Sequence, residues 1–263
     1  MNPVTSVIPG MSLLVTGAAH RLGRAIALGL AARGASIVVH FGGSREKAME
    51  TAEMARDLDV EAWLVQADLA DSGAVRAVAR TVESEVGRLD GIVHSAASFR
   101  QGTIDEIDAL KWDQIMAVNL RAPYLLTRGL LPHLQRSYRH TGHPASVTHV
   151  CDLSALHPWS GYGAHGVSKA GLLHLTRTLA RELAPAVRVN AVVPGAILPA
   201  PGVDPESEDW ARWGERLPLQ RTGDPEDVVS TIAFLIESGF VTGAAIPVDG
   251  GENLLGVGAR KPE

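Results

Sequence analysis

The stretch SLLVTGAAHRLGRAIALGLAARGASIVVH, residues 12–40, decides the fold of this chain. Short β-branched runs at 12–16 and 36–40 enclose a segment whose apolar residues recur with helical spacing. Gly34 follows that segment, where the cap of a helix C-terminus is expected. Near-continuous apolar runs such as Ile37-Val38-Val39 are typical of parallel strands buried on both faces. The stretch therefore predicts one βαβ unit.

The alternation of strands and helices continues to the end of the chain. Further strand-like runs lie at 61–66, 91–94, 146–151, 188–193 and 244–248. The Pro-rich stretch 194–205 is an insertion after the sixth strand, because helical and strand patterns still follow it. We therefore expect a single α/β domain over 1–263, a Rossmann-type doubly wound fold whose seven-stranded parallel sheet is flanked by helices.

Composition excludes several classes of function. The chain has 263 residues, 46% of them apolar, and a net charge of −5, as in ordinary globular proteins with a sizeable core. No cluster of Lys and Arg points to nucleic acid or to an anionic membrane. Cys151 is the only cysteine, and His140 and His143 stand apart from acids and thiols, so we expect no disulfide and no metal. No signal peptide or membrane span is readable, and a cytoplasmic location is expected.

The turn after the first strand, residues 16–23, has the composition of a phosphate-binding turn. Gly17 permits a tight turn, and Gly23 permits close approach of helix and strand. The helix that begins near Leu22 offers free N–H groups to a pyrophosphate. Arg21 replaces the middle glycine of the usual fingerprint and adds a cation beside the phosphates. Such a cluster alone is also compatible with an ordinary βα turn.

The residues after the second and third strands bear on the choice of cofactor. His40 ends the second strand and is expected to border the cofactor, but no acid follows it, where an NAD enzyme would bind the ribose 2′-hydroxyl. Ser44 and Arg45 could instead bind a 2′-phosphate, which favours NADPH, although Arg45 could also be a solvated helix residue. Asp68-Leu69 could contact the adenine, or Asp68 could cap the next helix.

From about residue 12 to 251 the sequence resembles the short-chain dehydrogenase/reductase family and, within it, the pteridine reductases. Its turn 16–23 is similar to the pteridine-reductase variant, and 94–99 resembles that group's Asn-Asn-Ala-Ser-Ser-Phe segment with both asparagines and the first serine altered. Asn119, Pro194-Gly195 and Asp249-Gly250-Gly251 also fall where the family has these residues. The resemblance implies a cofactor site that includes Ser95, Ala96, Pro194 and Gly195.

The catalytic signature of that family is altered in this chain. Lys169 matches the family lysine, but His165 stands four residues before it, at the position of the catalytic tyrosine. Asp152, thirteen residues before His165, matches the Asp that pteridine reductases carry in place of Ser. By resemblance, Lys169 would hold the nicotinamide ribose and Asn119 a water for proton relay.

An imidazole could replace the tyrosine as the proton donor. Positions 165 and 169 share one helix face, and histidine's ordinary pKa of about 6.5 suits a general acid. A nearby Lys169 would lower the pKa of His165, whereas Asp152 would raise it. The alternatives are that the site has lost its acid and only binds, and that Asp152 is a loop or helix cap.

The resemblance also implies a substrate pocket. Phe99 matches the residue that holds a pterin against the nicotinamide, and Arg21 and Asp152 could bind the polar edge of the ring. Tyr162 would form a wall of the pocket. Trp210, and Trp213 after it, lie in the expected substrate lid at about 196–217, unless they only pack a lid helix.

These features predict an NADPH-dependent oxidoreductase that reduces a pterin-like substrate (a dihydropteridine or dihydrofolate) or a related C=N or C=O bond. Two alternatives stay open: reduction of an unrelated ketone, and a non-catalytic NADP-binding protein that lost activity with the tyrosine. The family resemblance implies a homotetramer formed through long helices at about 112–136 and 163–183.

Overall fold

One sheet of seven parallel strands, in the order β3-β2-β1-β4-β5-β6-β7, forms the centre of the computed structural model, which describes residues 7–200 and 202–255. The strands are β1 (Ser12–Thr16), β2 (Ser36–Phe41), β3 (Ala62–Gln66), β4 (Gly91–His94), β5 (Ala145–Val150), β6 (Val187–Pro194) and β7 (Ala245–Val248). The predicted fold class is confirmed, and each predicted strand is within one residue of the observed ends. The small differences arise because strand ends depend on pairing with neighbours.

Helices connect the strands. They are α1 (Arg21–Ala31), α2 (Arg45–Arg56), α3 (Ser72–Thr81), α4 (Ala109–Met116), α5 (Ala122–Thr141), α6 (Gly163–Leu183), α7 (Glu208–Glu215) and α8 (Pro225–Glu237), with the short helical segments η1 (Val82–Val86), η2 (Ala117–Arg121), η3 (Leu153–Ala155) and η4 (Glu252–Leu255). Because η2 joins α4 to α5 without a break, the chain is helical from 109 to 141. The two long helices expected at 112–136 and 163–183 are therefore present.

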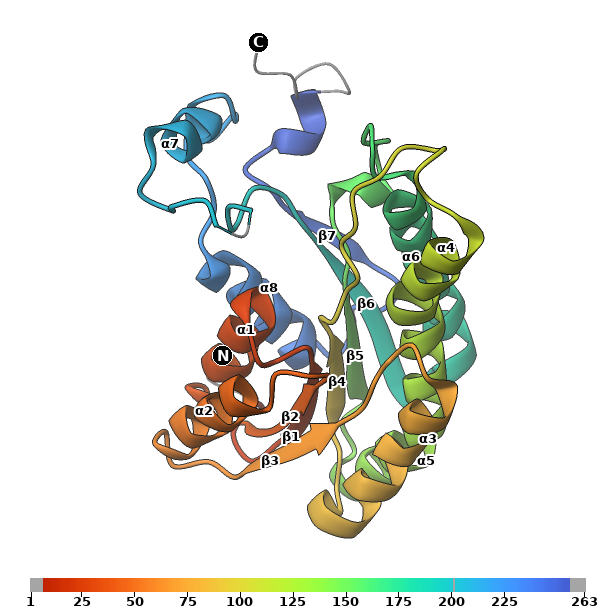
Figure 1. Cartoon of the computed structure of the whole chain (residues 1–263). Coiled ribbons are helices and arrows are strands. Elements are labelled where there is room, and N and C mark those ends of the chain that lie inside the picture. The colour runs from red at the N-terminus through yellow and green to blue at the C-terminus, as the bar shows by residue number, and fades with distance from the viewer. Residues whose placement is uncertain (1–6, 201, 256–263) are drawn as a thin grey trace.

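The helices form two layers, one on each face of the sheet (Figure 1). On one face α1, α2 and α8 bury apolar side chains such as Ile26, Leu30 and Val228 against the strands. The helices α1 and α8 approach so closely that a Cβ on Gly29 would lie 2.5 Å from Val229. On the other face α3, α5 and α6 form a second core. Burial of both faces explains the near-continuous apolar runs of the central strands.

The order of the strands places the candidate residues at one edge of the sheet. The chain crosses from β1 to β2 and β3 on one side, and then to β4 and beyond on the other, so the connections reverse direction between β1 and β4. In such sheets ligands bind outside the carboxyl ends of the strands at this reversal. The turns that follow β1, β2, β4, β5 and β6 carry most of the predicted site residues and meet at this edge.

The expected lid, at about 196–217, contains α7, and residue 201 within it lies outside the described residues. The hydroxyl of Ser207 caps α7 by accepting a hydrogen bond from the backbone N–H of Trp210. Figure 1 shows α7 standing away from the sheet and from α4 and α6. Its role as a lid stays a prediction.

The sequence predicts neither a membrane-spanning helix nor a metal site, and the structure bears on both only for the residues that it describes. None of the helices within 7–200 and 202–255 is long and apolar enough to cross a membrane. Over the same ranges, no group of three or more His, Cys, Asp and Glu side chains could hold a metal ion.

Candidate functional site

A buried carboxylate–imidazole pair lies just beyond the carboxyl end of β5. His165, in the first turn of α6, donates from Nε2 to Asp152 Oδ2 at 2.7 Å. The side chain of His165 is 1% exposed, whereas that of Asp152 is 19% exposed. Asp152 is therefore the member of the pair that reaches the open side of the site.

The surroundings of Asp152 keep it ionised. Burial opposes its charge, but the hydrogen bond from His165, the charge of Lys169 and a hydrogen bond from Ser154 outweigh burial and lower the pKa of Asp152 to about 2. Asp152 also accepts a hydrogen bond from the backbone N–H of Ser154 and caps η3. The capping role considered for Asp152 is thus present together with its contact to His165. At neutral pH Asp152 is therefore a carboxylate that accepts the Nε2–H of His165.

The other ring nitrogen of His165 lies in a web of hydrogen bonds around Asn119. His165 Nδ1 is 3.2 Å from the carbonyl oxygen of Ser98 and 3.3 Å from Asn119 Nδ2. Asn119 in turn accepts from the Ser98 N–H at 2.7 Å and donates to Ser168 Oγ at 3.0 Å. Both nitrogens of the imidazole therefore have protein partners, and the ring is held in one orientation.

Lys169 is buried beside this pair. Its ammonium donates to the carbonyl oxygen of Val150 at 2.8 Å, at the last residue of β5. Beneath it lies His149, whose Nδ1 is 2.8 Å from Thr176 Oγ1. The Thr176 hydroxyl already donates its proton to a backbone carbonyl, so His149 Nδ1 is the donor in this hydrogen bond. The ring of His94, opposite on β4, is 5.1 Å from that of His149. Burial and the charge of Lys169 lower the pKa of His149 to about 3, so this imidazole is neutral.

An aromatic platform borders the pair on its open side. Phe99 is 55% exposed and stacks on Tyr162, with ring centroids 4.8 Å apart. The edge of Phe99 also meets the ring of His165, again at 4.8 Å. Tyr162 precedes α6 as its N-cap residue and makes an edge contact with Trp159. The predicted substrate residues Phe99, Tyr162 and Asp152 are thus brought together around His165.

The turn after β1 fits a pyrophosphate. Gly17 has a φ of +69°, and a Cβ on Gly23 would lie 2.2 Å from the Gly17 carbonyl oxygen, so neither position admits another residue without strain. The helix α1 starts at Arg21 with no side-chain cap and no acid in its first turn, which leaves the N–H groups of Leu22 and Gly23 available to an anion. Thr16 Oγ1 ties this turn to the next loop by accepting from the N–H groups of Ser95 and Ala96.

His40 supports the turn from below rather than lining it. It is 2% exposed, its Nδ1 accepts from the Gly17 N–H at 3.3 Å, and its Nε2 donates to the Ala67 carbonyl oxygen at 3.2 Å. Burial lowers the pKa of His40 to about 4, which keeps the ring neutral and able to accept. A neutral His40 therefore fixes the turn that follows β1.

The residues predicted to select NADPH are exposed at the ends of β2 and β3. Arg45 is exposed and Ser44 half-buried, and neither side chain has a hydrogen-bond or ion-pair partner among the described residues. Asp68 is exposed and accepts from the Ala70 N–H, while Leu69 is buried. The cap of α3 is Asp71, not Asp68, so the alternative role considered for Asp68 is wrong.

Arg21 and the residues after β6 form the remaining edge of the candidate site. Arg21 adopts a left-handed backbone with φ +47°, and its guanidinium donates to the carbonyl oxygen of Pro199. A Cβ on Gly195, after Pro194, would lie 2.6 Å from Glu252 Oε2. Within the part of the chain that the structure describes, Trp210 makes no hydrogen bond or ring contact with Phe99 or Tyr162.

Several site residues escaped the sequence analysis. Thr16, Ser154 and Ser168 hold the loops and the pair through hydroxyl groups, and the Ser98 backbone bonds Asn119. Serine and threonine at the ends of apolar strands are too common to single out. The ring contact between His94 and His149 could have been predicted from the sequence. Two histidines in neighbouring buried strands are expected to be neutral and to need hydrogen-bond partners.

Comparisons with known proteins agree with this geometry. The family model described as Enoyl-(Acyl carrier protein) reductase matches residues 17–253. The 3-oxoacyl-[acyl-carrier-protein] reductase FabG of Staphylococcus aureus strain Mu50 is 31% identical over 243 residues, which cover 91% of this chain and 97% of that protein. The short-chain dehydrogenase/reductase FrzI of Cladobotryum sp is 31% identical over 262 residues, covering 95% and 98%.

Solved structures give the same result. FolM alternative dihydrofolate reductase 1 from Brucella suis, in complex with NADP, has a TM-score of 0.85 and 31% identity, covering 94% of this chain and 97% of that one. A blue fluorescent protein from a metagenomic library, in complex with NADPH, has a TM-score of 0.82 and 27% identity, covering 93% and 98%.

Proposed function

The chain belongs to the short-chain dehydrogenase/reductase family of oxidoreductases, and from this premise we propose that it reduces a pterin-like substrate, a dihydropteridine or dihydrofolate, with NADPH. The observation that carries the proposal is the exposed Phe99–Tyr162 platform beside the Asp152–His165 pair. A flat heteroaromatic ring gains from stacking on such a platform. Its polar nitrogen edge would then face the carboxylate of Asp152. The solved FolM reductase, with NADP bound, supports this choice.

The residues for NADPH follow from the same geometry. The turn at Gly17 and the start of α1 would hold the pyrophosphate, and Ser44 and Arg45 the 2′-phosphate. Lys169, by the family resemblance, would hold the nicotinamide ribose. When bound, NADPH would supply the hydride.

The protein's own part in the chemistry is to position the ring and move one proton. His165 holds that proton at Nε2, 2.7 Å from Asp152 Oδ2, and is itself closed off from the open side of the site. We propose that the imidazolium form of His165, with its Nδ1–H donated to the Ser98 carbonyl oxygen, passes its Nε2 proton through the Asp152 carboxylate to the substrate and is left as a neutral imidazole. Asn119 would hold Ser98 in place by bonding its N–H and its carbonyl. Ser154 would keep the other oxygen of Asp152 fixed.

Two other functions have their own supporting observations. The FabG relatives, which are named as 3-oxoacyl-[acyl-carrier-protein] reductases, favour reduction of a β-ketoacyl thioester. The histidine at the tyrosine position favours a protein that binds NADP without reducing anything. One assay distinguishes the three possibilities. It measures NADPH consumption with three substrates: a dihydropterin that lacks the glutamate tail of folate, dihydrofolate, and acetoacetyl-CoA.

The expected result is turnover of the pterins that exceeds turnover of the thioester. Preference for acetoacetyl-CoA would replace the pterin assignment by ketone reduction. Tight NADPH binding in calorimetry without turnover of any of the three substrates would favour the non-catalytic function.

The homotetramer and the cytoplasmic location stay predictions. Light scattering on the purified protein tests the first, and cell fractionation the second.

A further inference from the structure

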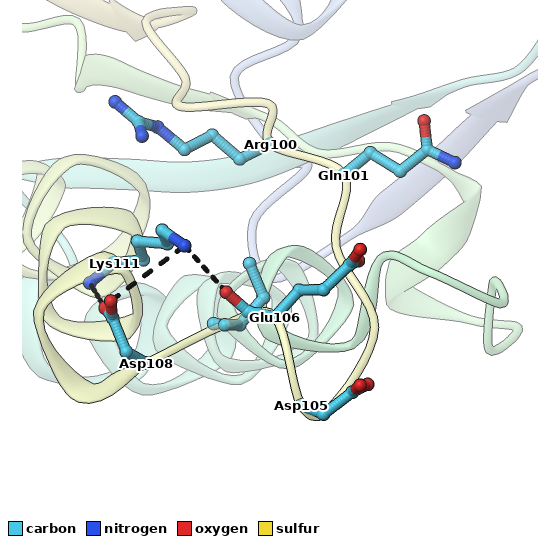
Figure 2. A pocket seen from close by; sticks show the side chains of 7 residues that line it. Arg100, Gln101, Asp105, Glu106, Asp108 and Lys111 are labelled. Carbon is cyan, nitrogen blue, oxygen red and sulfur yellow. Dashed lines mark hydrogen bonds and ion pairs between the residues drawn. The ribbon is translucent and has the colours of Figure 1, made fainter.

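A hollow of about 760 Å³ lies next to the aromatic platform, between the loop after β4 and the start of α4 (Figure 2). Polar or charged residues form its lining together with one apolar residue, and they are Arg100, Gln101, Asp105, Glu106, Asp108 and Lys111 beside Ile107. Arg100 directly follows Phe99 in the chain. The hollow therefore begins where the proposed ring-binding platform ends.

Arg100 is the cation in this hollow that is free to bind a ligand. It is exposed, and its guanidinium has no hydrogen-bond or ion-pair partner among the described residues. Lys111, in contrast, donates to the Glu106 carbonyl oxygen at 2.7 Å and lies 3.9 Å from Asp108. Figure 2 shows the charged ends of Arg100 and Lys111 on one side of the hollow.

The carboxylates of the hollow are engaged in local turns. Asp105 accepts from the Thr103 hydroxyl at 2.6 Å, and Glu106 accepts from the Thr103 N–H at 2.9 Å. Asp108 caps α4 by accepting from the Lys111 N–H. In Figure 2 the carboxylates of Asp105 and Glu106 lie on the side away from Arg100. The Asp108 carboxylate lies on the same side as Arg100 but next to the Lys111 ammonium, 3.9 Å away, so Arg100 carries the unpaired charge of that side among the described residues. An anion would therefore be attracted to the hollow through Arg100.

The backbone that carries Arg100 is fixed at both ends. On one side Asn119 bonds both the N–H and the carbonyl of Ser98. On the other, the Gly102 N–H donates to the Gly161 carbonyl oxygen at 2.8 Å, and Gly102 forms an isolated parallel bridge with Tyr162. The short segment between these two anchors contains Phe99 and Arg100. The backbone from which Arg100 projects is thus fixed before a ligand arrives, while its exposed guanidinium can turn towards one.

We propose that the hollow binds an anionic tail of the substrate and that Arg100 recognises its carboxylate or phosphate. This inference rests on the proposed function, because Phe99 would hold the ring that bears the tail. A guanidinium binds either anion through two parallel hydrogen bonds. The tail would be the glutamate of a folate, or else the phosphate of a pantetheine thioester if the substrate is a ketone.

The test compares ligands with and without the tail on the purified protein with NADP present. One pair is dihydrofolate and 6-methyldihydropterin, and the other is acetoacetyl-CoA and acetoacetyl-N-acetylcysteamine. The variants are Arg100→Gln, Arg100→Lys, and the control Arg76→Gln, which removes the same charge from an exposed position of α3. Dissociation constants are measured by calorimetry.

Arg100→Gln should weaken dihydrofolate binding about ten-fold, and 6-methyldihydropterin binding less than two-fold. Arg100→Lys should recover part of the loss, since it keeps the charge but not the two-pronged geometry. The control should bind all ligands as the wild type does.

The outcomes separate this inference from the proposed function. A selective loss for acetoacetyl-CoA alone would support the anionic tail as a phosphate and overturn the pterin assignment. If Arg100→Gln weakens no tailed ligand in either pair, or weakens tailed and tail-free ligands equally, the inference is wrong. Turnover of 6-methyldihydropterin would uphold the proposed function in that case.

Discussion

Mild acid should strongly destabilise this protein, because three histidines are buried as neutral rings beneath the site. Burial lowers the pKa of His40 from 6.5 to about 4, and burial with the nearby charge of Lys169 lowers that of His149 to about 3. Burial places the pKa of His94 well below 6.5 as well. Below pH 6.5 the unfolded chain therefore binds three protons that the folded chain does not.

The sign and size of the effect follow from this difference. The free energy of unfolding decreases as the pH falls from about 6.5 towards the pKa values of the three histidines in the folded state. Each group contributes about 1.4 kcal/mol per pH unit, so the three together contribute about 4 kcal/mol per unit. At pH 5 the loss is about 6 kcal/mol, a large part of the roughly 5–15 kcal/mol of a typical domain. Asp152, whose pKa is about 2, adds nothing in this window, because its contribution is lost only below its ordinary value of 3.8.

Urea unfolding followed by circular dichroism between pH 7.5 and 5 measures this slope. The variant His94→Asn removes one of the three groups while keeping a polar partner for Thr127, and should reduce the slope by about one third. The reasoning would be refuted if the wild-type slope between pH 6 and 5 corresponded to the uptake of one proton or fewer on unfolding. A His94→Asn slope equal to that of the wild type would also refute it.

Three further predictions concern the site. Phe99→Ala should weaken pterin binding in calorimetry while leaving NADPH binding nearly unchanged, since the ring is an exposed platform; equal losses would make Phe99 a packing residue. Arg45→Ala should lower the ratio of NADPH to NADH affinity by about ten-fold to a hundred-fold, and an unchanged ratio would place the selectivity elsewhere. His165→Ala and Asp152→Asn should each lower the reduction rate by about a hundred-fold, and the double variant little more, because both belong to one proton path; an additive double variant, or full activity of His165→Ala, would contradict this path.

The fold was predictable because its signals are local and repeated. The first βαβ unit is encoded by residues 12–40, and Gly17 and Gly23 sit where the structure leaves no room for a Cβ. The i, i+4 spacing of His165 and Lys169 placed both on one face of α6, as observed. Periodicity and glycine positions depend on residues that are close together in the chain, so both signals can be recognised in a single sequence.

The details of the site were not predictable because they depend on contacts between distant segments. His40 was expected to face the cofactor, but it lies under the Gly17 turn, since β2 turns its side chain into the interior. Arg21 was expected beside phosphates and substrate, and it bonds the carbonyl of Pro199 from a segment far along the chain. Neither sheet register nor the return of the chain after β6 can be read from a local pattern.

In the proposed function, a histidine where the family resemblance implies a tyrosine changes which group would deliver the proton. A tyrosine side chain ends in one hydroxyl that can reach a substrate directly, whereas an imidazole has two nitrogens, and here both have partners in the protein. The consequence is that Asp152 is the exposed end of a two-residue unit. Changing His165→Tyr alone would therefore remove the Nε2–H that keeps the Asp152 carboxylate bonded, instead of simply restoring the family pattern. An acid of this kind can work only if Asp152 contacts the substrate, which requires the ring to lie on Phe99 and any tail to leave towards Arg100.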